Sequence, residues 1–490
     1  MFFIRRPKQN FKRLGEVQSV FMRYGFQFLF QSPSKSRTKK FFEGTENEDP
    51  RYRQLSMPER LRLMLTELGP TYIKMGQVIS SRSDILPPEY VAELSKLQDD
   101  VAPFPFEQVR HVVESELKRP LEAVYLDFDP QPMAAASIGQ VHRATLWDGT
   151  PVVVKVQRPN IQPMVMADIE IIRTLVKMIE AANDWARRYR VIDFFEEFAK
   201  TITWEMDYLN EASNADHLRR IVVDHPHVRV PEMYWNYTTA RVLTMERVEG
   251  IKISQTDQLD AAGVDRKELA YHFTMSVMIQ LIIEGFFHGD PHPGNLYVEP
   301  ETQTLVYLDM GMMGRLVPTS REQLQDLILS LVRRDSEDVT RIVLQIGTPF
   351  RKVNERSLLL SIDHIINRYL EVSLDQLSFS ALVQEILATV FRHNIRLPGE
   401  FSLAMKTLVQ GEEVARQLDP QISLVEVVES VSQKVLNHMF SKDQIVDDFR
   451  DMARDVVRMK NVVPRAIETI LDQMSNGKFT VAMDIPRFKW

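Results

Sequence analysis

The segment His288-Gly289-Asp290-Pro291-His292-Pro293-Gly294-Asn295 is followed, fourteen residues after its last member, by Asp309-Met310-Gly311. An acid five residues before an amide, with a second acid beyond a short connection, is the pattern of a phosphoryl-transfer site. We expect Asp290 to accept or orient the proton of an attacking hydroxyl group or water molecule. Asn295 and Asp309 are expected to hold the magnesium ions that bridge the phosphates of a nucleotide.

The residues between Asn295 and Asp309 predict a β-hairpin. Leu296-Tyr297-Val298 and Leu305-Val306-Tyr307-Leu308 are apolar runs of strand type, and Glu299–Thr304 is the predicted turn. Such a hairpin would fix Asn295 and Asp309 at its opposite ends, with the rigidity that metal ligands require. The alternative is a loop with a chance His-x-Asp sequence and an aspartate in a structural capping role.

The composition is that of a globular protein with a sizeable core. The 490 residues allow two or three domains, or one elaborated domain. The net charge of −7 gives no reason to expect bulk binding of nucleic acid, so no nucleic-acid partner is predicted. The absence of cysteine excludes a disulfide framework, a thiolate metal site and a cysteine nucleophile, and it suits a reducing cytosol.

No segment has the pattern of a secretory signal or of a membrane-spanning helix. Met1–Phe42 lacks a continuous apolar region and is instead basic and aromatic. It either lies on an anionic membrane surface or forms a helix docked on the main domain with its basic face in water. The most apolar stretch, Leu269–Phe287, contains His272, Gln280 and Glu284, which favours a buried core helix.

Three consecutive helices are predicted near the N-terminus, and the third is opened by Pro87-Pro88 and runs to about Gln98. Ser56 and Glu59 form a capping-box start, and Pro70 opens the next helix. The second helix carries Lys74 and Gln77, which lie three residues apart on one helix face. Considered alone, these two side chains are most simply part of a solvated face.

A strand with one lysine in it is predicted at Pro151–Val156. The segment is rich in valine, and a lysine inside it costs free energy unless an anionic partner is present. In the N-lobe of a kinase such a lysine, here Lys155, holds the α- and β-phosphates and pairs with a glutamate from a helix. The alternative is a lysine on the exposed face of an edge strand.

The acids on a following helical segment offer that partner. Val191–Arg220 has helical periodicity and carries Glu205, Asp207 and Glu211. We expect Glu211 to pair with Lys155. The other two acids exceed what one ion pair requires, and considered alone they are surface charges that aid solubility.

The loop ahead of the lysine strand contains Ala134, Ala135, Ala136 and Ser137 where a protein kinase has glycines. We expect these four residues to cover the nucleotide phosphates. Glycine lets the backbone adopt positive φ and approach phosphates closely, whereas alanine does so only at a cost. The loop should therefore be stiffer, and efficient phosphorylation of proteins in general is not expected.

An inter-lobe hinge is predicted at Met245-Glu246-Arg247-Val248, directly after the strand pattern of Ala240–Met245. The backbone at Glu246 and Val248 would hydrogen-bond the edge of an adenine ring. Beyond residue 311 neither a long activation segment nor an A-P-E signature follows, and helical patterns take over. The predicted helices are Ser320–Arg334, Ser336–Gly347, Glu355–Tyr369, Phe379–Phe391, Pro398–Gln417 and Leu424–Met439.

Taken together, these residues resemble the UbiB/AarF family, also called ABC-one or ADCK-type atypical kinases. The resemblance covers about residues 61–314, and its motifs are specific. They are the K-x-G-Q motif at Lys74–Gln77, the alanine-rich loop at Ala134–Ser137, the strand of Lys155, the E-x-D motif at Glu205–Asp207, and the set Asp290, Asn295 and Asp309.

The resemblance implies an α+β, protein-kinase-like fold of two lobes with an added N-terminal helical extension and a mostly helical C-lobe. It implies binding of ATP with Mg2+ and support of the biosynthesis of ubiquinone or a related isoprenoid quinone at a membrane. Hydrolysis of ATP, or transfer to a small or lipid-like acceptor, is implied rather than phosphorylation of proteins in trans. The implied partners are a membrane lipid, a quinone precursor and quinone-biosynthesis proteins. The implied location is the cytoplasm, at the inner face of the membrane.

The resemblance also gives the K-x-G-Q residues a role. Lys74 and Gln77 would point into the nucleotide cleft, and Lys74 would pair with Glu205 or Asp207. A helix held there would exclude a polypeptide substrate and leave room for water or a small lipid-like molecule. Many bacterial members end in two hydrophobic anchor helices that this sequence lacks, so either the sequence is shortened or membrane contact is peripheral.

The predicted organisation has five parts: a basic aromatic segment at 1–50, a helical extension at 51–125, an N-lobe at 126–248, a helical C-lobe at 249–440 and a helical tail at 441–490. Two other functions stay open. A small-molecule phosphotransferase of the aminoglycoside and choline kinase type also fits the His288-Gly289-Asp290 start, although that group lacks the Lys74–Gln77 helix. A nucleotide-sensing scaffold that binds lipid and partner proteins, with little turnover, fits the stiff alanine loop.

Overall fold

The computed structural model describes most of the chain up to residue 423. The described residues are 7–26, 52, 54–80, 87–97, 102–182, 186–187, 190–225, 227–370, 379–423, 427 and 431. The chain divides into two compact units, Met1–Val427 and Val428–Trp490. All the helices and strands of the fold belong to the first unit, as far as the structure describes them. The helix predicted at Leu424–Met439 and the tail predicted at 441–490 lie outside the described residues, apart from Val427 and Val431.

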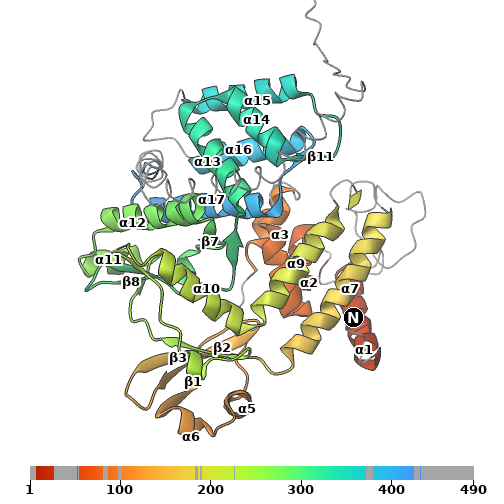
Figure 1. Cartoon of the computed structure of the whole chain (residues 1–490). Helices are drawn as coiled ribbons and strands as arrows, with labels where there is room; N and C mark the ends of the chain where they lie inside the picture. Colours follow the sequence, from red (N-terminus) through yellow and green to blue (C-terminus); the bar gives the residue numbers. More distant parts are fainter. Residues whose placement is uncertain are drawn as a thin grey trace, which may run out of the picture. The chain divides into compact units, whose positions relative to one another are not determined.

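Helices from the N-terminal region and from residues 161–205 lie together (Figure 1), and their buried side chains form one apolar core. The members of this group are α1 (Pro7–Arg23), α2 (Met57–Leu68), α3 (Pro70–Ser80), α4 (Pro88–Leu94), α7 (Ile161–Ala182) and α9 (Val191–Glu205). The predicted capping box at the start of α2 is present, because Ser56 and Glu59 exchange side-chain and backbone hydrogen bonds. Buried Met64, Tyr72 and Phe198 belong to this core, so α3 is fixed by packing on one side.

Helix α1 is docked on this group. Val17 and Phe21 are buried in the shared core, and the guanidinium of Arg13 donates to Asp168 of α7 and to the carbonyl of Leu68. Of the two interpretations of the basic N-terminal segment, its described part therefore corresponds to a docked helix. Residues 27–50 lie outside the description.

The N-lobe is an antiparallel sheet with helices against one face. Its strands are β1 (Asp127–Ala135), β2 (Gly139–Thr145), β3 (Pro151–Gln157) and β5 (Val242–Glu246), in that spatial order. Helices α5 (Phe106–Leu117) and α6 (Leu121–Val124), which lie within the helical extension predicted at 51–125, cover one face of this sheet. Val152, Val154 and Val156 point into that core, so the alternation of a strand places Lys155 on the other face.

The predicted single helix Val191–Arg220 is wrong, because the chain forms two helices there. Helix α9 ends at Glu205, and α10 spans Tyr208–Ile221. Asp207 lies between them with extended backbone angles, and its carboxylate accepts the N–H of Leu209 as the N-cap of α10. The two helices can therefore point Glu205 and Glu211 in directions that one straight helix would not allow.

The predicted catalytic hairpin is present. Strands β8 (Leu296–Glu299) and β9 (Thr304–Tyr307) pair with Leu296 opposite Tyr307. This register places Asn295 and Asp309 together at the open end, so the prediction that they lie at opposite ends is wrong. Two short strands complete the sheet, β4 (Val228–Arg229) beside β9 and β6 (Ile251–Lys252) beside β8.

The remainder of the first unit is mostly helical, as predicted. Its larger helices are α12 (Arg266–Met278), α13 (Pro318–Arg333), α14 (Ser336–Ile346), α15 (Glu355–Leu370), α16 (Phe379–Arg392) and α17 (Gly399–Leu418). A π-helix at Ile279–Glu284 extends α12 and leads into β7 (Phe286–His288), which pairs with β10 (Met313–Arg315). Within the described ranges, none of the helices combines the length and the apolar character that crossing a membrane requires.

Candidate active site

Lys155 and Glu211 form the central ion pair of the candidate site. Strand β3 carries the lysine and α10 carries the glutamate, and Lys155 Nζ lies 2.9 and 2.8 Å from the two carboxylate oxygens. Both side chains are mostly buried, with 15% and 7% of their surface exposed. The predicted pairing is therefore present, and the edge-strand alternative for Lys155 does not apply.

A second ion pair connects the N-terminal helices to the same cluster. Lys74 Nζ of α3 lies 2.8 Å from Glu205 Oε1 of α9. Of the two partners that the resemblance offered for Lys74, the structure places Glu205 against it, while Asp207 caps α10. We expected Gln77 to point at the nucleotide. Its side-chain N–H donates to the carbonyl of Leu97 at 3.2 Å, so Gln77 also connects α3 to the segment after α4.

The cluster contains more buried negative charge than positive charge. Burial raises the pKa of Glu205, and burial together with the neighbouring Asp309 raises the pKa of Glu211 to about 7. Burial alone would lower the pKa of Lys155, but the charges of Glu211 and Asp309 outweigh it, and the net shift is upward. Three carboxylates thus surround Lys155 and Lys74, and a further cation would stabilise them.

Asp309 and Asn295 are the residues predicted to hold such a cation. Asp309 follows β9, and its Oδ1 accepts the N–H of Gly311 at 2.8 Å, while the imidazole of His288 contacts the Asp309 carbonyl. Burial would raise the pKa of Asp309, but the Lys155 charge and the Gly311 N–H outweigh it and lower it. In the part of the chain that the structure describes, no three acidic or histidine side chains could hold a metal by themselves. The predicted donors, one carboxylate and one amide, offer the oxygen atoms that Mg2+ binds, and Mg2+ leaves its other positions to phosphate and water.

Asp290 is held by residues that the sequence analysis did not predict. Its Oδ1 accepts hydrogen bonds from Lys406 Nζ and Gln410 Nε2 of α17, both at 3.0 Å. Burial would raise the pKa of Asp290, but the nearby Lys406 and Gln410 outweigh it, and the net shift is downward. Asp290 is therefore ionised and suited to orienting a hydroxyl group rather than to keeping its proton.

The alanine-rich loop connects β1 to β2 as a tight hairpin. Ala136 N–H donates to the carbonyl of Gly139 at 2.7 Å, and Ser137 is buried. A Cβ on Gly139 would lie 2.4 Å from the hydroxyl of Tyr208, so only glycine fits there. The Tyr208 hydroxyl is buried without a hydrogen-bond partner among the described residues, beside Lys155. This unpartnered hydroxyl group beside Lys155 would gain a hydrogen-bond partner if nucleotide phosphates bound there as predicted.

The predicted hinge joins the N-lobe sheet to the catalytic hairpin. Glu246 ends β5, and its carboxylate accepts from Arg229 at 2.9 Å, while Arg229 also contacts Glu299 of β8. The backbone N–H of Glu246 donates to the carbonyl of Glu232 at 2.9 Å, and the contact of Glu246 and Val248 with an adenine edge stays a prediction. Arg229 was not predicted as part of the site.

A cavity of about 720 Å³ adjoins Asp290. Its walls come from α3, α9, α10, the segment after Asp309 and the start of α17, and they are more apolar than polar. Of the predicted site residues, it contains Lys74, Gln77 and Asp290. Its apolar walls include Val78, Phe194, Phe198, Trp204, Met312, Met313 and Leu403.

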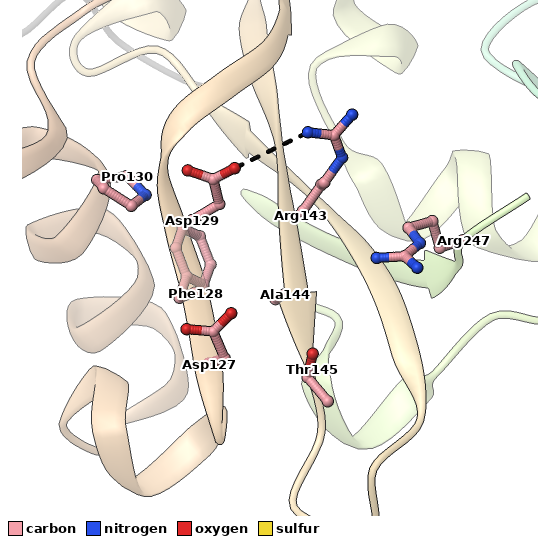
Figure 2. Close-up of a pocket in the computed structure, with 8 residues that line it drawn as sticks. All are labelled: Asp127, Phe128, Asp129, Pro130, Arg143, Ala144, Thr145 and Arg247. Atoms are coloured by element: carbon pink, nitrogen blue, oxygen red, sulfur yellow. Dashed lines mark ion pairs between the residues drawn. The ribbon is translucent and has the colours of Figure 1, made fainter. Parts of the chain in front are cut away.

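A second pocket, of about 290 Å³, lies on the N-lobe sheet away from these groups (Figure 2). Arg143 and Asp129 face each other across β2 and β1 at 4.0 Å, and Arg247 approaches from the hinge side. None of the predicted site residues lines it. The predicted site residues lie in the cluster around Lys155 and beside Asp290 instead.

Comparisons with known proteins show which family the chain resembles. Residues 96–343 match the ABC1 atypical kinase-like domain, and residues 362–423 match the UbiB helical domain. A chloroplast protein of Arabidopsis thaliana named activity of bc1 complex kinase 7 is 35% identical over 96% of this chain and 68% of its own length. A Marinobacter nauticus protein named probable protein kinase UbiB is 32% identical over 96% of this chain and 87% of its own length.

A solved structure shares the fold. It is a Mycobacterium tuberculosis protein in complex with erythromycin, with a TM-score of 0.50 and 24% sequence identity over 74% of this chain and 93% of that one. With the match to an atypical kinase-like domain, this confirms the predicted α+β, protein-kinase-like fold.

Proposed function

Because this chain belongs to the ABC1 atypical kinase-like family, we propose that it binds Mg·ATP and transfers the γ-phosphoryl group to water or to a small, lipid-like acceptor. The observation that carries the proposal is the cluster of Lys155, Glu211 and Asp309, in which buried carboxylates exceed the lysines that face them. A nucleotide phosphate chain on Lys155, with a divalent cation on Asp309, would complete that charge balance.

Each residue of the site has a role in this proposal. Lys155 would hold the α- and β-phosphates, and Glu211 keeps the lysine in place. Asn295 and Asp309 would hold Mg2+, which supplies charge stabilisation to the phosphates when bound. Asp290 would orient the attacking hydroxyl group or water. The Ala134–Ser137 loop would cover the phosphates, and the backbone at Glu246 and Val248 would hold the adenine.

The cavity beside Asp290 supports a small acceptor over a polypeptide. Helix α3 forms one of its walls, and the ion pair between Lys74 and Glu205 holds that helix at the cluster. The apolar surface of Phe198, Trp204 and Leu403 suits an apolar molecule with a hydroxyl group at one end. We propose a quinone precursor or a membrane lipid as this molecule, because relatives of the chain are named UbiB.

The proposed location is the inner face of the membrane, reached from the cytoplasm by peripheral contact. The apolar acceptor proposed above supports it, whereas the described part of the basic N-terminal segment is a docked helix. Proteins of quinone biosynthesis are the proposed partners there.

The test is phosphate release from Mg·ATP by the wild type and by Asp290→Asn, with and without anionic liposomes and a quinone-like phenol. We expect release that rises with membrane or phenol and falls by on the order of a hundredfold in the variant. A phosphorylated phenol among the products would identify a phosphotransferase. Nucleotide binding without release under any of these conditions would contradict the proposal and favour a nucleotide-sensing scaffold instead.

A further inference from the structure

Three side chains of helix α17 donate hydrogen bonds to the segment that carries Asp290. Lys406 Nζ and Gln410 Nε2 both donate to Asp290 Oδ1, and Thr407 Oγ1 donates to the carbonyl of His288 at 3.1 Å. Lys406 and Gln410 are four residues apart, so they share one face of the helix. The helix belongs to the region that matches the UbiB helical domain, whereas Asp290 lies in the atypical kinase-like domain. The two family regions therefore meet at the catalytic aspartate.

The two oxygens of the Asp290 carboxylate have different hydrogen-bond contacts. Oδ1 receives both hydrogen bonds from α17. Oδ2 has no hydrogen-bond partner among the residues that the structure describes. An acceptor hydroxyl group in the adjoining cavity, which Asp290 and Lys406 both line, would therefore meet Oδ2.

Gln410 is costly for stability in this position. While its Nε2 donates to Asp290, its Oε1 is buried without a hydrogen-bond partner among the described residues. A buried unsatisfied acceptor costs roughly 1–3 kcal/mol. Turning the amide around would place Oε1 against the Asp290 carboxylate, where two acceptor oxygens would repel each other. The aspartate therefore fixes the orientation of the Gln410 amide. A residue that lowers stability while it holds a catalytic group is the pattern expected of a functional constraint.

We propose that the helical domain completes the active site, with Lys406 and Gln410 as positioning residues that hold Asp290 through Oδ1 and leave Oδ2 to the acceptor. The proposal rests on the function proposed above and adds a second region of the chain to its machinery. Lys406 supplies the charge that keeps the carboxylate ionised, and Gln410 supplies its direction. The other titratable group that faces Asp290 is His288, whose Nδ1 accepts the Asp290 N–H at 3.1 Å.

The first experiment compares Gln410→Met with Gln417→Met, a matched change at an exposed position two turns further along α17. We expect Gln410→Met to unfold at the same temperature as wild type or higher, because the buried unsatisfied oxygen is gone. Its kcat should fall by on the order of tenfold to a hundredfold, with the Kd for Mg·ADP unchanged. Gln417→Met should change neither. A lower unfolding temperature with unchanged kcat would overturn the proposal.

The second experiment follows the pH dependence of Lys406→Met and Lys406→Arg. Without the cation, the acid limb of the kcat profile should move to higher pH, and arginine should restore part of the difference. An acid limb that stays in place in Lys406→Met would overturn the proposal.

If the wild type releases no phosphate, that result counts against the proposed function alone. A third measurement then tests the contact between Lys406 and Asp290 without an activity readout. The lowered pKa of Asp290 stabilises the fold above the unfolded-state pKa of about 3.9, and this stabilisation is lost as the pH falls. Asp290→Asn should therefore reduce the fall in unfolding temperature between about pH 5 and about pH 2.5, but only while Lys406 is present. The same reduction in a Lys406→Met background would refute the contact.

Discussion

The alanines of the phosphate loop adopt ordinary backbone angles. None of Ala134, Ala135 and Ala136 is among the described residues with positive φ, so the loop conformation does not require glycine. Ala135 pairs with Gln140 at the end of the β1–β2 ladder, which restricts it further. The stiffness that alanine gives this loop is therefore a property of the side chains and not of an unusual backbone.

Ala135→Gly should loosen the loop and change nucleotide affinity. The added backbone freedom corresponds to about 1 kcal/mol, or roughly fivefold in Kd for ADP or ATP. Calorimetric titration of both nucleotides measures the effect, with Ala262→Gly, at the exposed end of α11 (Thr256–Ala261), as the matched control. Equal affinities in wild type and Ala135→Gly would mean that the loop does not contact phosphate.

His142 shows how a buried histidine can be held neutral. Gln140 Oε1 accepts the N–H of Phe104, so its amide N–H faces His142 Nε2 at 2.9 Å, while His142 Nδ1 donates to the carbonyl of Asp129. A proton on His142 Nε2 would point at the amide N–H of Gln140, and two donors that face each other repel. Burial lowers the pKa of His142 in agreement with this.

The network predicts a loss of stability on acidification. Unfolded histidine takes up a proton near pH 6.5, whereas folded His142 takes it up at lower pH, so stability falls as the pH drops through that range. Between pH 7.5 and pH 5.5 the unfolding temperature of wild type should therefore fall more than that of His142→Gln. His111→Gln, at an exposed position on α5, is the control and should follow wild type. Parallel curves for wild type and His142→Gln would disprove the assignment.

At the scale of elements, the junction between α9 and α10 orients the acids of the site. Asp207 caps α10, and the break that it makes separates Glu205 from Glu211. Asparagine caps a helix about as well as aspartate, whereas alanine costs about 1 kcal/mol. Asp207→Asn should therefore preserve stability and nucleotide binding, and Asp207→Ala should lower the free energy of unfolding by about 1 kcal/mol in urea titrations. A loss of nucleotide binding in Asp207→Asn would show that its charge acts in the site.

The same junction marks a limit of prediction from sequence. Helical periodicity continues through residues 191–220, so the pattern gives no sign of the break except an aspartate at 207 that can serve as a cap. Elements with a distinct local signal were predicted well, among them α2 with its capping box and the hairpin of β8 and β9. The register of that hairpin depends on strand pairing, which explains why the relative placement of Asn295 and Asp309 was predicted wrongly.

At the scale of the whole molecule, α3 is bound to the cluster by one mostly buried ion pair. Glu205 has 7% of its side-chain surface exposed, so removing its partner leaves a buried charge uncompensated. Lys74→Met should therefore lower the free energy of unfolding by about 3 kcal/mol. Adding Glu205→Gln should recover part of this loss, because the unpaired charge is then gone. A double variant whose loss equals the sum of the single losses would contradict the coupling.

The candidate site was predicted from sequence as far as local motifs extend. Lys155, Glu211, Asp290, Asn295 and Asp309 each lie in a segment whose pattern suggests its role. Lys406 and Gln410 lie more than a hundred residues beyond Asp290 on an amphipathic helix with no such pattern, so only the fold brings them to the aspartate. Arg229 is missed for the same reason, because its partners Glu246 and Glu299 belong to two separate strands.

The dependence of nucleotide binding on magnesium should act through Asp309. It is tested most directly by calorimetric titration of ADP and ATP into wild type and Asp309→Asn, each with Mg2+ and with EDTA, after confirming by circular dichroism that both are folded. Wild type should bind nucleotide more tightly with Mg2+, and Asp309→Asn should bind with the weaker affinity under both conditions. An Asp309→Asn variant that keeps the full magnesium-dependent gain in affinity would contradict the account.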